Sequence, residues 1–486
     1  MNSLEEKDRE SAAILWLMIA VTFVAMLFCC AYTSPLYPHY SNSDSSIFVL
    51  IGKGITEGKL CYVDLFDHKG PVLFFLEALG WKIGGRTGIW LLECAAMLLS
   101  ELAILGICRQ LKAKPWLPIV SSAVVLFYTF CHGNLTEDYS LPLIYGSIYF
   151  AVKYFLSASD RHPVRYAYFY GICVGLIAFI RINNALIIFA LILGIMIDLI
   201  RKQQLPNMFA NLAAGLLGVV TIAAPICLYF YFHGSLYDMI YATFLYNLIY
   251  AEESSHLHLW ENLLFVVLYA PIVFSIIVFL KSRYKYSKPM MTSLLIASVL
   301  SFLMLLYANV YEHYFTLAIP LFTVAVAMAA PHPKLRELLH PSKNASVMLV
   351  CLGLIVLAHS GLTAYRAAAP FYKSYLTDIA YDRYHQLSES ANMIPEDERS
   401  SVLGLGIPAE WYLDMDITPC YKYYTLQQWW STSEKDVYGE TVSYVEDEHP
   451  LWLVTKVGDD YGVDEIDHSY ELIEENDYAS FYRYEG

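Results

Sequence analysis

A short stretch near the N-terminus combines residues that could perform acid–base chemistry and bind an anion. Residues 40–71 read YSNSDSSIFVLIGKGITEGKLCYVDLFDHKGP, with carboxylates at Asp44 and Asp67 followed by His68 and Lys69. A carboxylate held outside a membrane can accept a proton from an attacking hydroxyl, and lysine and histidine can bind a phosphate. Because these charges are interleaved with apolar residues, the stretch predicts a site at the boundary between water and lipid.

Two of these residues also have a purely structural interpretation. Asp44 directly precedes an apolar stretch of helical length, and aspartate is favoured at the first position of a helix. Lys69 precedes a second apolar stretch, where a lysine could anchor the chain at the membrane surface. The residues taken one at a time leave both interpretations open.

Other polar residues lie in segments that are expected on the same face of the membrane. Glu137 and Asp138 open a predicted span and could hold an acceptor, bind a metal or act as the base, or they could simply place negative charge at a helix N-terminus. Arg181 lies at a turn between two short spans and could share phosphate binding. His313 either lines the site or packs at the interface, where histidine and tyrosine are common.

Metal binding has only weak support in the sequence. The stretch YAEESSHLH offers carboxylates and two histidines, His256 and His258, but their spacing would make the two rings diverge on a helix. The ten cysteines show no metal-binding spacing. We therefore expect no required cofactor and leave a divalent cation open.

The composition excludes an ordinary soluble protein. The chain has 486 residues, of which 57% are hydrophobic and 16% are charged, and a soluble domain cannot bury that much apolar surface. About eleven segments have the length of about 15–25 residues that crossing a bilayer requires. They lie near residues 12–33, 88–108, 117–132, 141–157, 167–180, 185–200, 208–231, 260–280, 290–309, 316–331 and 345–365.

The basic residues predict the orientation of a multi-pass protein of the plasma membrane. If the N-terminus is cytoplasmic, the inner loops carry the lysines and arginines, whereas the outer loops 133–140, 232–259 and 310–315 carry none. This asymmetry is the positive-inside pattern. An odd number of spans then places the C-terminus outside the cell. The first outer loop, residues 34–87, holds two apolar stretches that are too short to span, and we expect both to be helices lying in the membrane interface.

The tail has a different composition. From Arg366 to the C-terminus there are 25 acidic and 8 basic residues, a net charge of 8 − 25 = −17. Three strand-like runs, SVLGLG, PLWLVTK and ELIEE…YASFYRYE, predict a small extracytoplasmic α/β domain. We expect a membrane domain over residues 1–366 and this acidic domain over 367–486. So acidic a surface would not attract nucleic acid. Its many tyrosines and tryptophans suit stacking on sugars or packing on outer loops.

The order of these features resembles a known family. A first span, an aspartate shortly after it, an amphipathic helix and then YVDLFDHKGP are similar to the first outer loop of GT-C glycosyltransferases. The likeness is strongest to the bacterial relatives of protein O-mannosyltransferases and lipid A aminoarabinose transferases. GNLTEDYSLP, AFIRINNAL and YEHYFTLAIP extend it through the membrane part but not into the tail. Relatives often carry an acidic pair where this chain has Asp44 followed by Ser45.

The resemblance implies an inverting glycosyltransferase without a cofactor. Its donor would be a sugar linked to polyprenyl phosphate, and its acceptor a hydroxyl of a cell-envelope glycan, lipid or protein at the outer face. Asp44 would be the general base and Lys69 would contact the lipid phosphate. The remaining candidates for substrate binding are Asp67, His68, Glu137, Asp138, Arg181 and His313.

A transporter or flippase of lipid-linked sugars is the alternative from another class. It would share the hydropathy and the intramembrane acids. Such carriers often show paired broken spans in two repeated halves, with the site near the middle of the membrane. The sequence shows no such pairing, and its charges gather at one face, which favours the enzyme.

Overall fold

The structure is a computed structural model. It describes residues 13–20, 22, 26–27, 33–36, 44–129, 133–254, 266–307, 311–329, 393–426, 430–431, 436–457 and 469–486. Contacts between residues in space group the chain into two compact units. Helices α3 (Pro71–Leu111) and α8 (Leu205–Phe232) contribute to both. The membrane unit comprises Met1–Cys29, Leu91–Tyr229 and Ser254–Ala367, and the loop-and-tail unit comprises Cys30–Trp90, Phe230–Glu253 and Ala368–Gly486.

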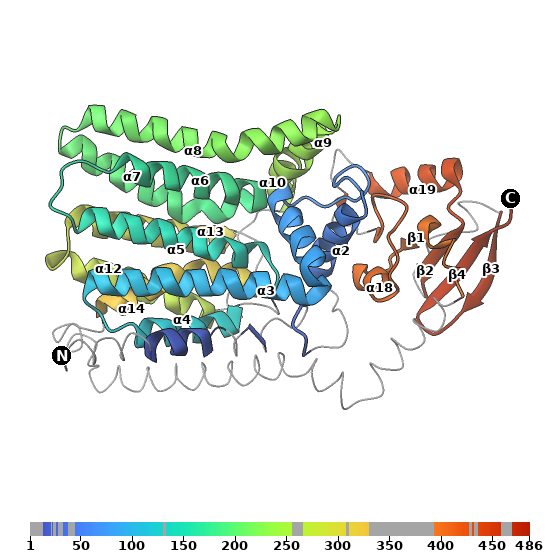
Figure 1. Ribbon diagram of the computed structural model, residues 1–486, viewed down its shortest axis with the longest axis horizontal. Coiled ribbons are helices and arrows are strands. Elements are labelled where there is room, and N and C mark those ends of the chain that lie inside the picture. Colours follow the sequence, from blue (N-terminus) through green and yellow to red (C-terminus); the bar gives the residue numbers. More distant parts are fainter. Residues whose placement is uncertain are drawn as a thin grey trace. The chain divides into compact units, whose positions relative to one another are not determined.

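The membrane unit is built from apolar helices that run side by side (Figure 1). Helix α7 packs on α13, α12 packs on α14, and α14 packs on α4. The α-helices are α3 (Pro71–Leu111), α4 (Trp116–Thr129), α5 (Thr136–Phe155), α6 (Val164–Arg181), α7 (Leu186–Arg201), α8 (Leu205–Phe232), α12 (Ala270–Lys281), α13 (Lys288–Tyr307) and α14 (Ile319–Ala329). Short 3₁₀ turns at Ile182–Ala185, Val266–Tyr269, Ser282–Tyr284 and Glu312–Ala318 join or extend them.

These helices agree with the predicted spans wherever the structure describes them. Residues 13–20 are helical, and every predicted span from 88–108 to 316–331 overlaps one of the helices just given. The predicted span 345–365 lies outside the described residues. Within the described part of the chain, five helices are long and apolar enough to cross a membrane. The chain is a multi-pass membrane protein.

Helix α3 bends at a glycine pair. Gly84 and Gly85 have non-helical backbone angles, and Gly85 has a φ of 58°, which favours glycine because it has no Cβ. The bend separates a first part, residues 71–83, from a second part, residues 86–111. The sequence predicted this separation, since it expected a short helix up to the glycines and a span after them.

The loop-and-tail unit combines helices from three regions of the chain with one sheet. The helices are α2 (Asp44–Thr56), the first part of α3, α9 (Leu236–Ile240), a π-helical turn (Tyr241–Leu245), α10 (Tyr246–Ser254), a 3₁₀ turn (Arg399–Ser401), α18 (Ala409–Asp414) and α19 (Val437–Glu448). The strands are β1 (Val402–Leu405), β2 (Trp452–Lys456), β3 (Tyr470–Glu475) and β4 (Ala479–Tyr484). Their order in the sheet is β1-β2-β4-β3 (Figure 1).

The sheet contains the strand-like runs that the sequence indicated. Strands β1 and β2 are parallel, with α18 and α19 between them in the chain, and β2, β4 and β3 pair in antiparallel fashion. Strands β1, β2 and β4 fall within the three predicted runs, and β3 begins one residue before its run. The division of the chain into domains at residue 366 stays a prediction, since the backbone contacts group the tail with the first loop and with residues 230–253.

The structure shows what helix α2 packs against. Its residues from Ser45 to Gly54 are all buried in protein. Helix α18 of the tail packs on α2, and a Cβ added at Gly52 would collide with Glu77 and Ala78 of α3. The apolar side chains of α2 therefore cover other helices. The position of both short helices in the membrane interface stays a prediction.

Candidate active site

Four of the predicted residues meet in the loop-and-tail unit, and we call Asp44, Asp67, His68 and Lys69 the first-loop cluster. Asp44 is the first residue of α2, and the other three lie in the loop between α2 and α3. The Lys69 ammonium is 3.7 Å from the Asp44 carboxylate and 3.8 Å from the Asp67 carboxylate. The loop therefore places one cation between two carboxylates.

The histidine completes this arrangement. The Nζ atom of Lys69 is 3.0 Å from Nε2 of His68. Because an ammonium has only hydrogens to donate, Nε2 must accept, and the proton of a neutral ring then lies on Nδ1. That nitrogen is 3.9 Å from Oδ2 of Asp67. The Lys69 ammonium therefore has the His68 ring as a close neighbour in addition to the two carboxylates.

The two carboxylates, Asp44 and Asp67, differ in their exposure to solvent. The Asp44 side chain is 43% exposed, whereas those of Lys69 and Asp67 are 8% and 2% exposed. Burial raises the pKa of Asp67 above its ordinary value of 3.8, and the nearby Lys69 opposes this rise. The geometry therefore makes Asp44 the carboxylate that a substrate can reach, and makes Asp67 a buried counter-charge for the lysine.

Residues from another region hold the backbone of this loop. The Tyr62 hydroxyl donates to the carbonyl of Lys69 at 2.8 Å, and Thr243 donates to the Tyr62 hydroxyl at 3.4 Å. The Asn247 amide donates to the carbonyl of His68 at 2.7 Å. Thr243 lies in the π-helical turn that leads into α10, and π-helical turns are frequent at functional sites. The backbone carbonyls of His68 and Lys69 are thus both fixed by hydrogen bonds.

Two tyrosines of α10 support the histidine ring. Tyr246 and Tyr250 stack on His68 with ring centroids 5.2 and 5.8 Å away and an interplanar angle of 28° in both cases. The two tyrosines are one helical turn apart, so their rings lie on the same face of α10. This contact fixes the plane of the imidazole.

The tail also forms part of the environment of the cluster. The backbone N–H of Phe66 donates to the carbonyl of Lys422 at 3.0 Å, and the Phe66 ring makes edge contacts with Tyr423 and Trp430. Five of the tail's aromatic side chains for which sugar stacking was considered are buried here: Trp411, Tyr412, Tyr423, Tyr424 and Trp430 are at most 1% exposed. These five form packing contacts and present no surface for a sugar, whereas Trp429 lies outside the described residues.

The opposite end of α2 is bound to the tail as well. The buried Lys53 forms an ion pair with Asp416 at 2.9 Å, and Thr418 donates a hydrogen bond to Glu57. Because Asp44 begins the same helix, the tail contributes to holding the position of the candidate base.

Three predicted residues, Glu137, Asp138 and Arg181, lie in the membrane unit, and together with Glu93 of α3 we call them the α5–α6 cluster. Arg181 is 3.3 Å from the Glu137 carboxylate and donates to the Tyr314 hydroxyl at 2.7 Å. Glu137 also accepts a hydrogen bond from Thr136 at 2.9 Å. The Glu137 side chain is only 2% exposed.

The other carboxylates of this cluster bind backbone groups. Asp138 accepts from the backbone N–H of Leu135 at 2.7 Å and so caps its own helix. Glu93 accepts from the backbone N–H of Asn134 at 2.6 Å. The structural interpretation of Asp138, negative charge at a helix N-terminus, is therefore what the geometry shows.

His313 lies in the same unit, within the 3₁₀ turn before α14. Its ring stacks on Tyr311 at 5.6 Å and meets the edge of Tyr314 at 4.6 Å. Since Tyr314 receives the hydrogen bond of Arg181, His313 is connected to that arginine through an aromatic neighbour. Its role in substrate binding stays a prediction.

Metal binding stays an open expectation. Among the residues that the structure describes, no group of three or more histidines, cysteines and carboxylates is placed to hold a metal ion. His256 and His258 lie outside the described residues.

The sequence did not reveal Tyr62, Thr243, Asn247 or the tail residues as neighbours of the loop. One signal was present, because Tyr246 and Tyr250 are spaced by four residues, as in an aromatic face of a helix. For Tyr62 no local signal exists. Its φ of 74° is unusual for a residue with a side chain, and it becomes visible only in the folded loop.

Comparisons with known proteins agree with this fold. The family model described as "Putative competence-induced protein Ccs4 N-terminal domain" matches residues 5–371. No curated protein sequence matches the chain. Crystal structures of ArnT from Cupriavidus metallidurans, bound to undecaprenyl phosphate and in the apo state, are similar with a TM-score of 0.59 and identities of 12% and 13%, over 97% of this chain and 98% of ArnT. The oligosaccharyltransferase AglB from Archaeoglobus fulgidus has a TM-score of 0.48 and an identity of 12%, over 94% of this chain and 72% of AglB. The likeness to ArnT shows a fold of the GT-C glycosyltransferase type, which confirms the resemblance seen in the sequence.

Proposed function

This chain belongs to the family described as "Putative competence-induced protein Ccs4 N-terminal domain", and we propose that it is an inverting glycosyltransferase. In this proposal it moves a sugar from a polyprenyl-phosphate carrier to an acceptor hydroxyl at the outer face of the membrane. The GT-C fold supports this assignment, as does the fact that ArnT was crystallised with undecaprenyl phosphate. The acceptor would be a glycan, lipid or protein of the cell envelope.

The observation that carries the proposal is the pairing of Asp44 with Lys69. A partly exposed carboxylate lies 3.7 Å from a largely buried ammonium. The reaction needs these two charges next to each other, because a base must act on the acceptor while a cation stabilises the departing phosphate.

The step proceeds by one displacement. Asp44 accepts the proton of the acceptor hydroxyl as the hydroxyl oxygen bonds to the anomeric carbon, and the bond between that carbon and the phosphate oxygen breaks on the opposite side. The anomeric configuration inverts, and the electron pair leaves with polyprenyl phosphate. Lys69 donates to the phosphate oxygens. The phosphate is stable as an anion, so the step needs no strong general acid.

The other residues of the cluster support this lysine. Asp67 and His68 hold the ammonium in place before the donor arrives. His68 and Arg181 remain proposed further contacts to the phosphate. Glu137, Asp138 and His313 remain proposed contacts to substrate, although the first two already have partners within the protein.

The direct test uses purified full-length protein and radiolabelled polyprenyl-phosphate sugars. We expect release of free polyprenyl phosphate, detected by thin-layer chromatography, and transfer of label to an acceptor from the cell envelope. Lys69→Ala should weaken donor binding and slow release together, by about 10–100-fold, because a hydrogen bond to a charged group contributes roughly 1.5–3 kcal/mol. Donor that crosses proteoliposomes without cleavage would instead establish the flippase alternative.

The proposed orientation has a separate test. With a cytoplasmic N-terminus, a cysteine that replaces the exposed Tyr438 in α19 should react with an impermeant maleimide added to intact cells. A cysteine that replaces the exposed Lys285, in a predicted inner loop, should react only after the cells are opened. The reverse labelling would place the first-loop cluster on the cytoplasmic side and contradict an outer-face reaction.

A further inference from the structure

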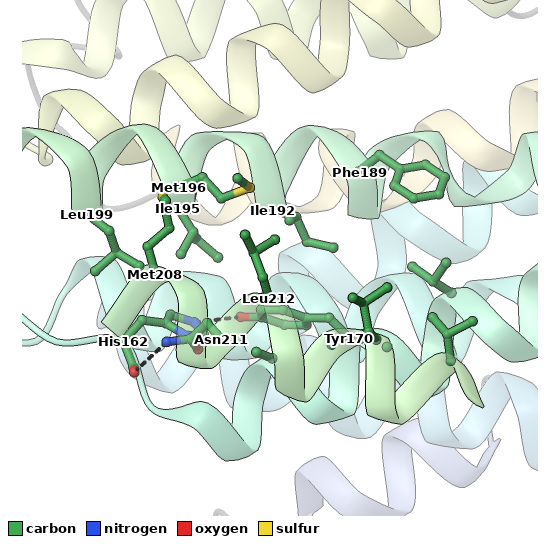
Figure 2. Close-up of a pocket in the computed structure, with 16 residues that line it drawn as sticks. His162, Tyr170, Phe189, Ile192, Ile195, Met196, Leu199, Met208, Asn211 and Leu212 are labelled. Carbon is green, nitrogen blue, oxygen red and sulfur yellow. Dashed lines mark hydrogen bonds between the residues drawn. The ribbon is translucent and has the colours of Figure 1, made fainter. Parts of the chain in front are cut away.

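An apolar crevice opens between α6, α7 and α8 in the membrane unit. Its volume is about 230 Å³, and apolar side chains of the three helices line it, among them Val174, Ile192, Ile195 and Leu212. Figure 2 shows the α7 side chains in a row along the crevice, from Phe189 to Leu199. None of the residues proposed for the reaction lines it.

The polar groups at one end of the crevice are bound to one another. Nδ1 of His162 is 2.6 Å from Oδ1 of Asn211, and the Asn211 amide donates to the His162 carbonyl at 3.2 Å (Figure 2). Asn207 also donates to that carbonyl, at 3.1 Å. Burial lowers the pKa of His162 to about 4, so its ring is neutral at physiological pH. The crevice therefore offers hydrocarbon surface along its length and holds no buried charge.

The crevice opens on the lipid-facing side of these helices. Two lining residues, Phe189 of α7 and Leu216 of α8, are 46% and 66% exposed. Both lie within segments that are long and apolar enough to cross a membrane. Large apolar side chains at such positions face the hydrocarbon of the bilayer, so a lipid chain can enter from the side.

Basic residues lie close along the chain to the His162 end of the crevice. Arg161 and Arg165 flank His162 at the start of α6, and Arg201 and Lys202 lie at the end of α7. The two regions are in contact, because Lys202 donates to the carbonyl of Ser159 at 3.4 Å. Two carboxylates, Asp160 and Asp198, lie among them, and Asp198 pairs with Lys202 at 3.0 Å. Four cations against two carboxylates leave a net positive rim.

We propose that this crevice is a binding site for an anionic glycerophospholipid, with one acyl chain between α6, α7 and α8 and the head group on the basic rim. The lining supplies apolar surface for the chain, and the rim supplies charge for the phosphate. The sequence predicts that these loops are cytoplasmic, and the cytoplasmic leaflet is rich in anionic lipids.

The site is distinct from the α5–α6 cluster. Arg181 is the last residue of α6, whereas His162 and Arg161 precede its first residue, Val164. At 1.5 Å per residue, the two ends of this helix are about 26 Å apart. The inference also does not rest on the proposed transferase activity, because it uses only the crevice, its opening and its rim.

The test uses the full-length protein in nanodiscs that contain a photoreactive phosphatidylglycerol with a diazirine on one acyl chain. We expect cross-links on peptides of α6, α7 and α8 that line the crevice, well above those on other lipid-facing peptides. Gly215→Leu should abolish this excess. A Cβ at Gly215 would meet only the Ala167 carbonyl, at 3.6 Å, so the new side chain fills the crevice without forcing the helices apart.

A matched control lies two residues earlier on the same helix. Ala213 is exposed and does not line the crevice, so Ala213→Leu adds the same bulk to the lipid-facing surface and should leave the cross-links unchanged. Undiminished labelling of Gly215→Leu would overturn the proposal, and so would equal loss in both variants.

A second comparison tests the head group. Photoreactive phosphatidylglycerol should label the crevice more strongly than phosphatidylcholine with the same chains, and Arg161→Gln should reduce that preference by about fivefold. Equal labelling by the two lipids would overturn the assignment to an anionic phospholipid. Labelling by a photoreactive polyprenyl phosphate but not by phosphatidylglycerol would overturn it too, in favour of the carrier lipid.

Discussion

The first-loop cluster and the α5–α6 cluster contain the same kinds of residue but differ in what those residues are bound to. Asp44 and Asp138 both lie in the first turn of a helix, and a basic residue lies near a carboxylate in each cluster. Asp138 is buried and accepts a hydrogen bond from the backbone N–H of Leu135, so its carboxylate caps its own helix. Asp44 is 43% exposed and lies 3.7 Å from Lys69.

The cations differ in the same way. Arg181 is bound by a carboxylate and by a tyrosine hydroxyl at hydrogen-bonding distance, 3.3 and 2.7 Å. Lys69 has Nε2 of His68 at 3.0 Å and its two carboxylates at 3.7 and 3.8 Å, the latter beyond a direct hydrogen bond. A phosphate that approaches Lys69 therefore competes with carboxylates at a longer distance than one that approaches Arg181. Residue type and helix position do not distinguish the two clusters, but distances and exposure do.

The largest expected effect tests the two aspartates against each other. Asp44→Asn should lower the rate of sugar transfer by about 10²–10⁴-fold, the usual cost of losing a general base, while donor binding is retained. Asp138→Asn should lower the thermal stability and slow sugar transfer far less than Asp44→Asn does, because the Asp138 carboxylate is already bound to the backbone N–H of Leu135. Turnover would be measured by release of labelled polyprenyl phosphate, and stability by tryptophan fluorescence on heating. The reverse pattern would make Asp138 the base and Asp44 the cap.

The second prediction concerns the ion pair of the α5–α6 cluster. Arg181→Ala should cost about 3 kcal/mol in the free energy of unfolding, because it leaves the buried Glu137 without its cation. Adding Glu137→Gln should recover much of this loss, since the amide carries no charge. Both variants would be compared by denaturant titration of the purified protein. An Arg181→Ala variant that is as stable as wild type would contradict this prediction and with it the contrast between the two clusters.

A third prediction uses pH to examine the buried carboxylate of the first-loop cluster. Because the pKa of Asp67 is raised above its unfolded value of 3.8, its contribution to stability is fully present below about pH 3.8 and is lost as the pH rises through the folded pKa. Asp67→Asn removes this dependence while the amide oxygen can still accept the Lys69 N–H. The unfolding free energy of wild type relative to the variant should therefore fall with rising pH, by about 1.4 kcal/mol for each unit of pKa difference. A difference that rises with pH would show that Lys69 lowers the pKa by more than burial raises it.

The sequence was sufficient for the features that depend on neighbouring residues. Long apolar segments predicted the helices of the membrane unit, and an apolar stretch too short to span, followed by a separate span, predicted the two parts of α3. Asp67, His68 and Lys69 are consecutive, so no folding information was needed to place them together. The strands of the tail alternate with turn-forming residues, which made their runs visible.

The features that the sequence missed depend on residues far apart in the chain. The apolar residues of α2 suit a membrane surface as well as a protein core, and only the structure shows that α18 and α3 cover them. Asn247 is 179 residues from His68, and Trp430 lies farther still from Phe66. Hydropathy cannot report such pairings, since it describes how apolar a segment is and not what covers it.

The smallest expected effect concerns one of these long-range hydrogen bonds. The Asn247 side chain holds the carbonyl of His68 at 2.7 Å and thereby the backbone on which Lys69 is carried. Asn247→Ala removes this bond, whose net contribution is about 1 kcal/mol. Asn184 offers a matched control in the membrane unit, because its amide donates to the Ser140 hydroxyl at 3.1 Å. Both alanine variants should lose similar stability on heating. Only Asn247→Ala should also lower kcat/KM for the donor, by about fivefold, because a loosened loop presents Lys69 less often in the position that binds the phosphate. Equal kcat/KM values for the two variants would mean that the hydrogen bond stabilises the fold without positioning the lysine.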